Sequence, residues 1–227
     1  MADDETVPVR VWDLPTRVFH WLLAFCVAST LIAAWRGGNA MEWHLRLGYA
    51  IFALLLFRLV WGFVGGHWSR FRSFLYRPRD ALRYVRGQSR ADEFHHVGHS
   101  PLGAWSVFAL LAVLALQVGT GLFANDEIAT TGPLNRFVSD RTASLLTHWH
   151  TVFGQGLVLA LVALHLAAIG YYALRLKRHL VPSMWHGDKH LPADVPAAVD
   201  TWGARTLALV VLALAAAVVT WVVRLGA

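Results

Sequence analysis

Four long stretches of the chain contain no Asp, Glu, Lys or Arg: residues 18–35, 101–125, 142–174 and 206–223. A helix needs about 20 mostly apolar residues to cross a bilayer, so each stretch predicts a membrane span. We expect a fifth span from residues 47–69, which carry a single charged side chain, Arg58. The sequence therefore predicts an all-α integral membrane protein.

The composition agrees with this prediction. Hydrophobic residues make up 56% of the chain and charged residues 15%, against about 45–50% and about 25% in soluble domains. The sequence pI is near 10.1, but the basic residues lie between apolar runs, which favours a membrane surface over nucleic acid. The single cysteine, Cys26, excludes an intramolecular disulfide framework, covalent haem attachment through CxxCH and a four-cysteine iron–sulfur site.

The loop charges predict an orientation. With the N-terminus in the cytoplasm, the cytoplasmic segments hold 15 Lys and Arg and the opposite segments hold 5, as the positive-inside rule requires. The C-terminus then lies outside, in the periplasm of a Gram-negative bacterium, and the protein is a multi-pass protein of the inner membrane. The acidic start MADDETVPVR does not have the pattern of a signal peptide, so we expect the first span to be retained.

Two connections are long. In the segment near residues 71–90, Arg79, Arg83 and Arg86 fall at helical spacing, which indicates an amphipathic interfacial helix that starts near Pro78. The alternative is a solvated basic loop that contacts lipid headgroups. Residues 176–201 contain three prolines and predict an irregular cytoplasmic linker.

Four histidines fall inside the predicted spans at two depths. His150 and His165 are 15 residues apart, which is about 22 Å along a helix, and their side chains lie within about 60° of one face. His148 is about 100° from His165 and is the poorer candidate. Under the predicted orientation His20 matches the depth of His165, and His44 matches the depth of His150.

Two opposed histidine pairs at two depths are what two stacked haems, each held by two histidines, would require. The alternative is that the histidines make interhelical hydrogen bonds. A zinc site is less favoured because the pairs are too far apart for one tetrahedral site. A proton relay is less favoured because the spans contain no Asp or Glu.

Several other residues fit the haem hypothesis. Arg58 lies about 21 Å deeper than His44 and within about 40° of its face, where a guanidinium could pair with a haem propionate. Arg17, one turn before His20, is a second candidate, and for both the alternative is snorkelling to headgroups. Gly48 would let a flat macrocycle approach the helix, or would serve helix packing. Gln117 would face a quinone or a haem edge, or make an interhelical hydrogen bond.

Five sequence features occur in a fixed order along residues 8–187: VWDLPTRVFHW (11–21), HLRLGYAIFALLLFRLVWGFVG (44–65), GHSPLGAW (98–105), LQVGTGLF (116–123) and the histidine pair of the fourth span. As an ordered set they resemble the bacterial cytochrome b561 and nickel–iron hydrogenase cytochrome b family. This resemblance implies a four-helix transmembrane bundle with two stacked, non-covalent b haems.

The resemblance also implies the ligand sets, with His20 and His165 on the inner haem and His44 and His150 on the outer haem. Many relatives have His-Glu where this chain has His150-Thr151, and His148 is nearby, so either histidine remains a candidate for the outer ligand. His99, in the GHSPLG stretch, would touch a propionate or quinone, or belong to a simple loop-to-helix turn at Pro101.

The predicted function is transmembrane electron transfer between the quinone pool and a periplasmic redox partner, such as a c-type cytochrome or a dehydrogenase or hydrogenase subunit. The chain would be the electron-transfer subunit of a membrane oxidoreductase system. We expect residues 1–187 to form the core, 188–203 a linker and 204–227 an additional C-terminal helix. One alternative is a stand-alone quinone-linked oxidoreductase, such as a superoxide oxidase. The other is a non-redox anchor or transporter whose histidines are structural.

Overall fold

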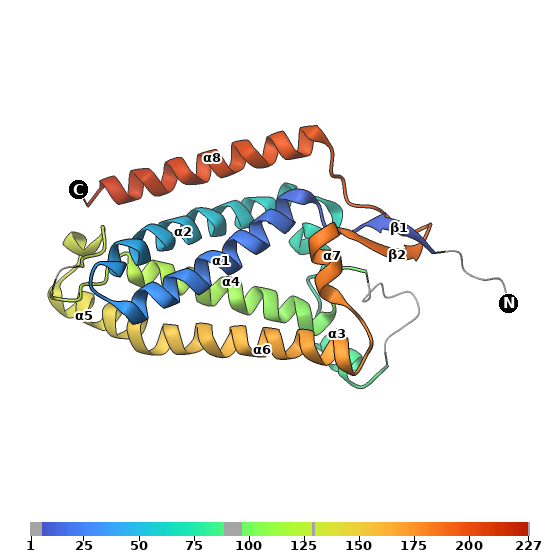
Figure 1. Ribbon diagram of the computed structural model, residues 1–227, viewed down its shortest axis with the longest axis horizontal. Coiled ribbons are helices and arrows are strands. Elements are labelled where there is room, and N and C mark those ends of the chain that lie inside the picture. Colours follow the sequence, from blue (N-terminus) through green and yellow to red (C-terminus); the bar gives the residue numbers. More distant parts are fainter. Residues whose placement is uncertain (1–5, 89–96, 129, 227) are drawn as a thin grey trace. The chain divides into compact units, whose positions relative to one another are not determined.

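The computed structural model describes residues 6–88, 97–128 and 130–226, and these residues are mostly helical (Figure 1). Five helices are long and apolar enough to cross a membrane. They are α1 (Leu14–Arg36), α2 (Ala40–Val64), α4 (Pro101–Gly121), α8 (Trp202–Arg224) and the continuous helix Asp140–Leu174. Their lengths of 21 to 35 residues meet the requirement of about 20. The prediction of five helices long and apolar enough to span a membrane, including one through Arg58, is confirmed.

Local sequence signals explain where these helices begin and end. Asp13 caps α1, because its Oδ1 accepts the Thr16 N–H at 2.8 Å. Ser100 caps α4 in the same way, with the Gly103 N–H 3.2 Å from its Oγ. α1 ends at Gly37, whose φ of +61° suits glycine. The helix predicted from residue 47 begins earlier, at Ala40, because a polar first turn precedes the apolar run.

The longest helix is not uniform. α5 (Asp140–His148) and α6 (Gln155–Leu174) are joined without a break by η4 (Trp149–Gly154), which is one stretch of π-helix. π-helical turns are rare and are frequently found at functional sites. No feature of the apolar pattern predicted this turn.

The chain divides into two compact units. The first comprises Met1–Val18, Arg58–Phe108 and Leu164–Leu209. The second comprises Phe19–Phe57, Ala109–Ala163 and Val210–Ala227. Each of the five long helices contributes residues to both units.

The first unit contains a small antiparallel sheet. Strand β1 (Thr6–Arg10) pairs with β2 (Asp188–Pro192), with Arg10 opposite Asp188. The prediction of an irregular linker over residues 176–201 was therefore wrong, since α7 (Leu180–His186) and β2 lie within it. Neither local pattern nor proline content could have revealed this strand, because its partner lies at the other end of the chain.

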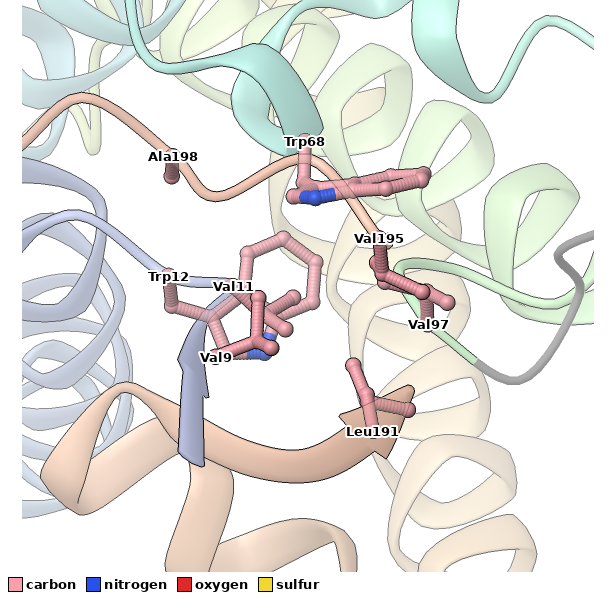
Figure 2. Close-up of a cluster of buried hydrophobic side chains, with 8 residues drawn as sticks. All are labelled: Val9, Val11, Trp12, Trp68, Val97, Leu191, Val195 and Ala198. Atoms are coloured by element: carbon pink, nitrogen blue, oxygen red, sulfur yellow. The ribbon is translucent and has the colours of Figure 1, made fainter. Parts of the chain in front are cut away.

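A hydrophobic cluster fills the space beside this sheet (Figure 2). Its members come from the two strands, the residues that follow β1, the 3-10 turn η1 (His67–Ser69) after α2, the loop before α4 and the segment that leads to α8: Val9, Val11, Trp12, Trp68, Val97, Leu191, Val195 and Ala198. The Trp68 Nε1–H donates to the carbonyl of Pro196 at 2.8 Å. The cluster therefore joins segments from both ends of the sequence into one packed cap.

Asp13 is the polar centre of the first unit. It is completely buried, and besides capping α1 it accepts hydrogen bonds from Trp61 Nε1 (3.2 Å), the Gly66 N–H (3.1 Å) and Ser69 Oγ (2.7 Å). A buried carboxylate is tolerated only when it is satisfied in this way. Asp13 therefore ties the start of α1 to the end of α2 and the turn after it.

A short helix, α3 (Pro78–Val85), begins at the proline where the sequence predicted a helix start. Asp80 stabilises its first turn by accepting the Arg77 N–H at 3.0 Å and by pairing with Arg83 at 2.7 Å. Its placement at a membrane surface stays a prediction.

In the second unit, α8 presents one face to the rest of that unit. Val211, Ala215 and Val219 are buried at a spacing of four residues, whereas Leu214 and Trp221 are 62% exposed. This is the pattern of a helix with one packed face and one lipid-compatible face.

An ion-pair network links β1, β2 and the start of α8 in the first unit. Arg10 pairs with Asp188 at 2.7 Å and with Asp200 at 3.1 Å, and Asp200 also pairs with Arg205 at 3.0 Å. Burial alone would raise the pKa of Asp200, but its hydrogen bonds and the charges of Arg205 and Arg10 outweigh this and lower the pKa.

We expect Asp200→Asn to destabilise the protein by about 1–3 kcal/mol at neutral pH, since a charged group loses its hydrogen-bonded partners. The folded-state pKa of Asp200 is lowered, so its contribution is present above the pKa of a free aspartate, about 4. It is lost as the pH falls through the folded-state value. Thermal unfolding of both proteins in detergent should therefore give a difference at pH 7 that shrinks in acid. An equal midpoint at pH 7 would contradict this role.

Candidate functional site

The second unit contains a cavity of about 270 Å³. Its walls come from α1, α2, α4, the loop after α4 and the helix Asp140–Leu174, and they are mostly apolar. Among the lining residues are His44, His150, Thr30, Gln117 and Gly48. Cofactor sites of helical bundles are built from side chains on facing helices in this way.

His44 and His150 face each other across this cavity. Their ring centroids are 5.9 Å apart and their planes are at 89°. Two metal–nitrogen bonds of about 2 Å each, with about 1 Å from each nitrogen to its ring centroid, separate two axial imidazoles by about 6 Å. The observed distance therefore fits two histidines on opposite sides of one metal ion.

Each of these histidines has Nδ1 within hydrogen-bond distance of a backbone carbonyl. His44 Nδ1 lies 3.1 Å from both the carbonyl oxygen and the hydroxyl of Thr30, and His150 Nδ1 lies 2.8 Å from the Gln117 carbonyl oxygen and 3.5 Å from the Thr120 hydroxyl. A carbonyl only accepts, so in the tautomer that bonds these carbonyls Nδ1 carries the proton and Nε2 carries the lone pair. This is the usual arrangement of a histidine that binds a metal through Nε2.

Two glycines shape the walls around the pair. A Cβ at Gly121 would lie 2.7 Å from His150 Cε1, so the imidazole occupies space that any other residue would take. A Cβ at Gly48 would meet nothing within 4 Å. Gly48 thus leaves the cavity wall open one turn after His44, as a flat macrocycle would need.

His150 belongs to the π-helical turn η4, and His148 does not line the cavity. His148 is exposed, and its ring packs on Phe153 with centroids 5.4 Å apart. Of the two candidates that the sequence left open, the structure brings only His150 toward His44. The ligand role itself stays a prediction.

The other two predicted ligands lie in different units. His20 is on α1 in the second unit, half-buried, with its ring 5.1 Å from that of Trp21. His165 is on α6 in the first unit and is also half-buried. The pairing of these two histidines stays a prediction.

The predicted propionate partners both donate to carbonyls of the first unit. Arg58 is 4% exposed, its Nη1 donates to the Ser69 carbonyl at 2.9 Å, and its guanidinium carbon lies 4.8 Å from the Phe71 ring centroid. Arg17 Nη1 donates to the carbonyl of Trp185 at 2.6 Å. Arg58 therefore does not snorkel, since its side chain is enclosed by protein.

His99 packs among aromatic side chains of the first unit. Its ring centroid is 4.8 Å from that of Trp12 and 4.4 Å from that of Phe74. Its backbone carbonyl accepts the Tyr76 hydroxyl at 3.0 Å.

Sequence reasoning missed two residues with central positions. Asp13 was not singled out, although a buried aspartate before a proline at a helix start is a capping signal. Thr30 was also missed, since threonine is common in membrane helices and its spacing carries no signal.

Among residues 6–88, 97–128 and 130–226, no group of three or more His, Cys, Asp or Glu is arranged to hold a metal ion. The candidate site is thus a two-histidine site.

Apolar membrane-spanning helices that direct a histidine pair into an apolar cavity are features of membrane cytochromes. The model of the prokaryotic cytochrome b561 family matches residues 11–187, and the chain belongs to this family. It is therefore a membrane cytochrome b with haem-dependent electron transport, and its cofactor is b-type haem. The resemblance inferred from the ordered motifs is confirmed.

Two curated relatives are similar over much of the chain. One is the "Probable Ni/Fe-hydrogenase 1 B-type cytochrome subunit" of Escherichia coli K12, 23% identical over 209 residues that cover 76% of this chain and 85% of the relative. Another is the "Probable Ni/Fe-hydrogenase B-type cytochrome subunit" of Bradyrhizobium diazoefficiens, 22% identical over 148 residues, or 52% of this chain and 59% of the relative. No solved structure matches the chain.

We expect Gly121→Ala to lower the haem content of the purified protein, because the added methyl group displaces the His150 ring. Gly119→Ala is the matched control, since a Cβ at Gly119 on the same helix would meet nothing within 4 Å. The measurement is the haem-to-protein ratio of the two variants and the wild type. Equal ratios in all three would show that the contact between Gly121 and His150 is unimportant for haem binding.

Proposed function

We propose that the chain is a dihaem cytochrome b that carries electrons across the membrane between quinone and a redox protein on the periplasmic side. Its four-helix core, residues 1–187, would hold two stacked haems. The observation that carries the proposal is the His44–His150 pair, with its 5.9 Å separation and both Nδ1 protons held by carbonyls.

The proposed ligand sets are His44 with His150 for one haem and His20 with His165 for the other. The second set is supported by the depth arithmetic along the helices and by the family to which the chain belongs. The two histidines on the helix Asp140–Leu174 are 15 residues apart, which is about 22 Å of helix. This spacing leaves room for one haem near each surface of the membrane.

A haem held by two histidines supplies a one-electron redox couple with no open position for a substrate. The residues of the chain orient the ligands and set the environment of the haem. The carbonyls of Thr30 and Gln117 fix the tautomer and orientation of the two imidazoles. The walls of the cavity are mostly apolar, and hydrogen bonds to the ligands together with burial tune a haem potential.

We propose Arg17 and Arg58 as cations for the propionates of the haem between His20 and His165. A guanidinium has five N–H donors, so one bond to a carbonyl leaves donors for a carboxylate. For His99, the position just before α4, which begins at Pro101, and the contacts with Trp12 and Phe74 support the alternative of a loop-to-helix turn more than contact with a propionate or quinone. The open wall at Gly48 supports its proposed role of admitting the macrocycle edge.

The proposed membrane placement follows from the charges of the sequence. The N-terminus lies in the cytoplasm and the C-terminus in the periplasm, with the protein in the bacterial inner membrane. Residues 188–203 connect the core to the fifth helix, residues 204–227. The packed face of α8 supports a role in the membrane domain itself.

The proposed partner is a hydrogenase or dehydrogenase subunit, or a c-type cytochrome. Relatives that carry the hydrogenase subunit description support the first of these. The alternative is a stand-alone quinone-linked oxidoreductase, such as a superoxide oxidase. Haem reduction by a substrate in the absence of any partner protein would favour that alternative.

The test is the haem-to-protein ratio of the purified chain, with oxidised and dithionite-reduced spectra. We expect two non-covalent low-spin b haems per chain. A quinone analogue added to the reduced protein in vesicles should then reoxidise them. One haem per chain would show that one histidine pair is misassigned. Folded protein without haem, from cells supplied with haem, would contradict the proposal.

The ligand sets predict the behaviour of single variants. We expect His165→Ala to lose one of the two haems and retain the other, because only one pair loses a ligand. His148→Ala is the matched control and should retain both, since His148 lies outside the cavity. Two haems at full occupancy in His165→Ala would overturn the pairing.

A further inference from the structure

We propose that Thr30 and Gln117 are positioning residues that fix the His44 and His150 imidazoles through reciprocal hydrogen-bond pairs. Each pair joins one candidate ligand to one residue of a neighbouring helix by two bonds that run in opposite directions. This inference deepens the proposed function and rests on the ligand roles of His44 and His150.

The first reciprocal pair joins α1 to α2. The His44 Nδ1–H donates to the Thr30 carbonyl at 3.1 Å, and the Thr30 hydroxyl donates back to the His44 carbonyl at 3.2 Å. The same hydroxyl also lies 3.1 Å from His44 Nδ1. A backbone carbonyl has two lone pairs, so that of His44 can accept this bond in addition to one within the helix. Thr30 thus holds both the ring and the backbone of His44.

The second reciprocal pair joins α4 to the π-helical turn. The His150 Nδ1–H donates to the Gln117 carbonyl at 2.8 Å, and the Gln117 Nε2–H donates back to the His150 carbonyl, also at 2.8 Å. The pattern is the same as that of Thr30 and His44, although the helices and the residue types differ. Because the two facing histidines have chemically equivalent hydrogen-bond pairs, we infer that both pairs position a candidate ligand.

The surroundings of Gln117 are built to keep it in place. Its Oε1 lies where a Cβ at Gly154 would be, so the glycine at the end of η4 admits the amide. One turn after Gln117, Gly121 admits the His150 ring. A π-helical turn widens the helix and changes the pairing of its carbonyls. A side-chain amide that donates to the His150 carbonyl stabilises this geometry.

The consequence concerns orientation. The hydrogen bond from Nδ1 alone would still allow the imidazole ring to rotate about the line of that bond. The returning bond, from the Thr30 or Gln117 side chain, holds the backbone carbonyl of the histidine that carries the ring. Together they hold the ring planes at 89°. In an apolar environment these polar groups have few other partners, so the pairs should persist. Thr30 and Gln117 therefore act on a haem through its ligands, without touching it.

The test uses Thr30→Val and Gln117→Leu, which remove the returning bond but keep the accepting carbonyl and the approximate volume. Two controls lie outside this cavity. Thr206→Val and Thr220→Val each remove a hydroxyl that donates to a carbonyl one turn earlier in the same helix, that of Trp202 and that of Ala216.

The first readout is the low-spin EPR signal and redox titration of the purified dihaem protein, because that signal depends on the orientation of the two axial imidazoles. We expect each test variant to retain both haems, but to shift or broaden the signal and the midpoint potential of one haem only. The same haem should be affected in both variants. Thr30→Ser, which keeps the hydroxyl, should restore the wild-type signal, and the two controls should leave it unchanged.

The second readout does not require haem. Hydrogen exchange of peptides that contain His44 or His150 should become faster in the matching test variant and not in the controls. Wild-type signals in both test variants, or equal shifts in test and control variants, would overturn the proposal. If His150→Ala retained both haems, the ligand assignment itself would be wrong. Faster exchange in Gln117→Leu would then still establish the hydrogen-bond pair as structural only.

Discussion

An imidazole placed among apolar helices must give its N–H to an acceptor within the protein, because hydrocarbon offers none. In this cytochrome the acceptor for both His44 and His150 is a backbone carbonyl of a neighbouring helix. A ring that donates through Nδ1 keeps the lone pair on Nε2, where a metal could bind, and the contact requires close approach of the helices, which Gly121 permits. The same constraint governs Asp13, whose carboxylate is buried only because four donors surround it.

The long helices were predictable because length and apolar content decide whether a segment spans a membrane, and neither depends on tertiary contacts. The candidate ligands were predictable in part, since spacing along a helix places residues such as His44 by depth. The π-helical turn was not predictable, because it adds no polar residue to the pattern. An interhelical hydrogen bond of Gln117 was one of the two sequence alternatives, and the structure has one, to the His150 carbonyl. That partner and the bonds of Thr30 could not be predicted, since they depend on which helices are neighbours.

Arg58 shows why a charge in a span cannot be interpreted from sequence alone. Snorkelling and pairing with a haem carboxylate predict the same residue at the same depth. In the structure the Arg58 side chain is buried. Its guanidinium donates to the Ser69 carbonyl and lies against the Phe71 and Phe74 rings. A cation with five donors can satisfy several acceptors at once, so these contacts and a carboxylate are compatible.

The pairing of β1 with β2 has a consequence for biosynthesis. Arg10 and Asp188 are 178 positions apart, so at about 5–20 residues per second the first strand waits roughly 10 to 40 seconds for its partner. During that time four of the five long helices are made while β1 has an open edge. The cap that joins the N-terminal strand to the segment before α8 can therefore close only late, after the four preceding long helices have been synthesised.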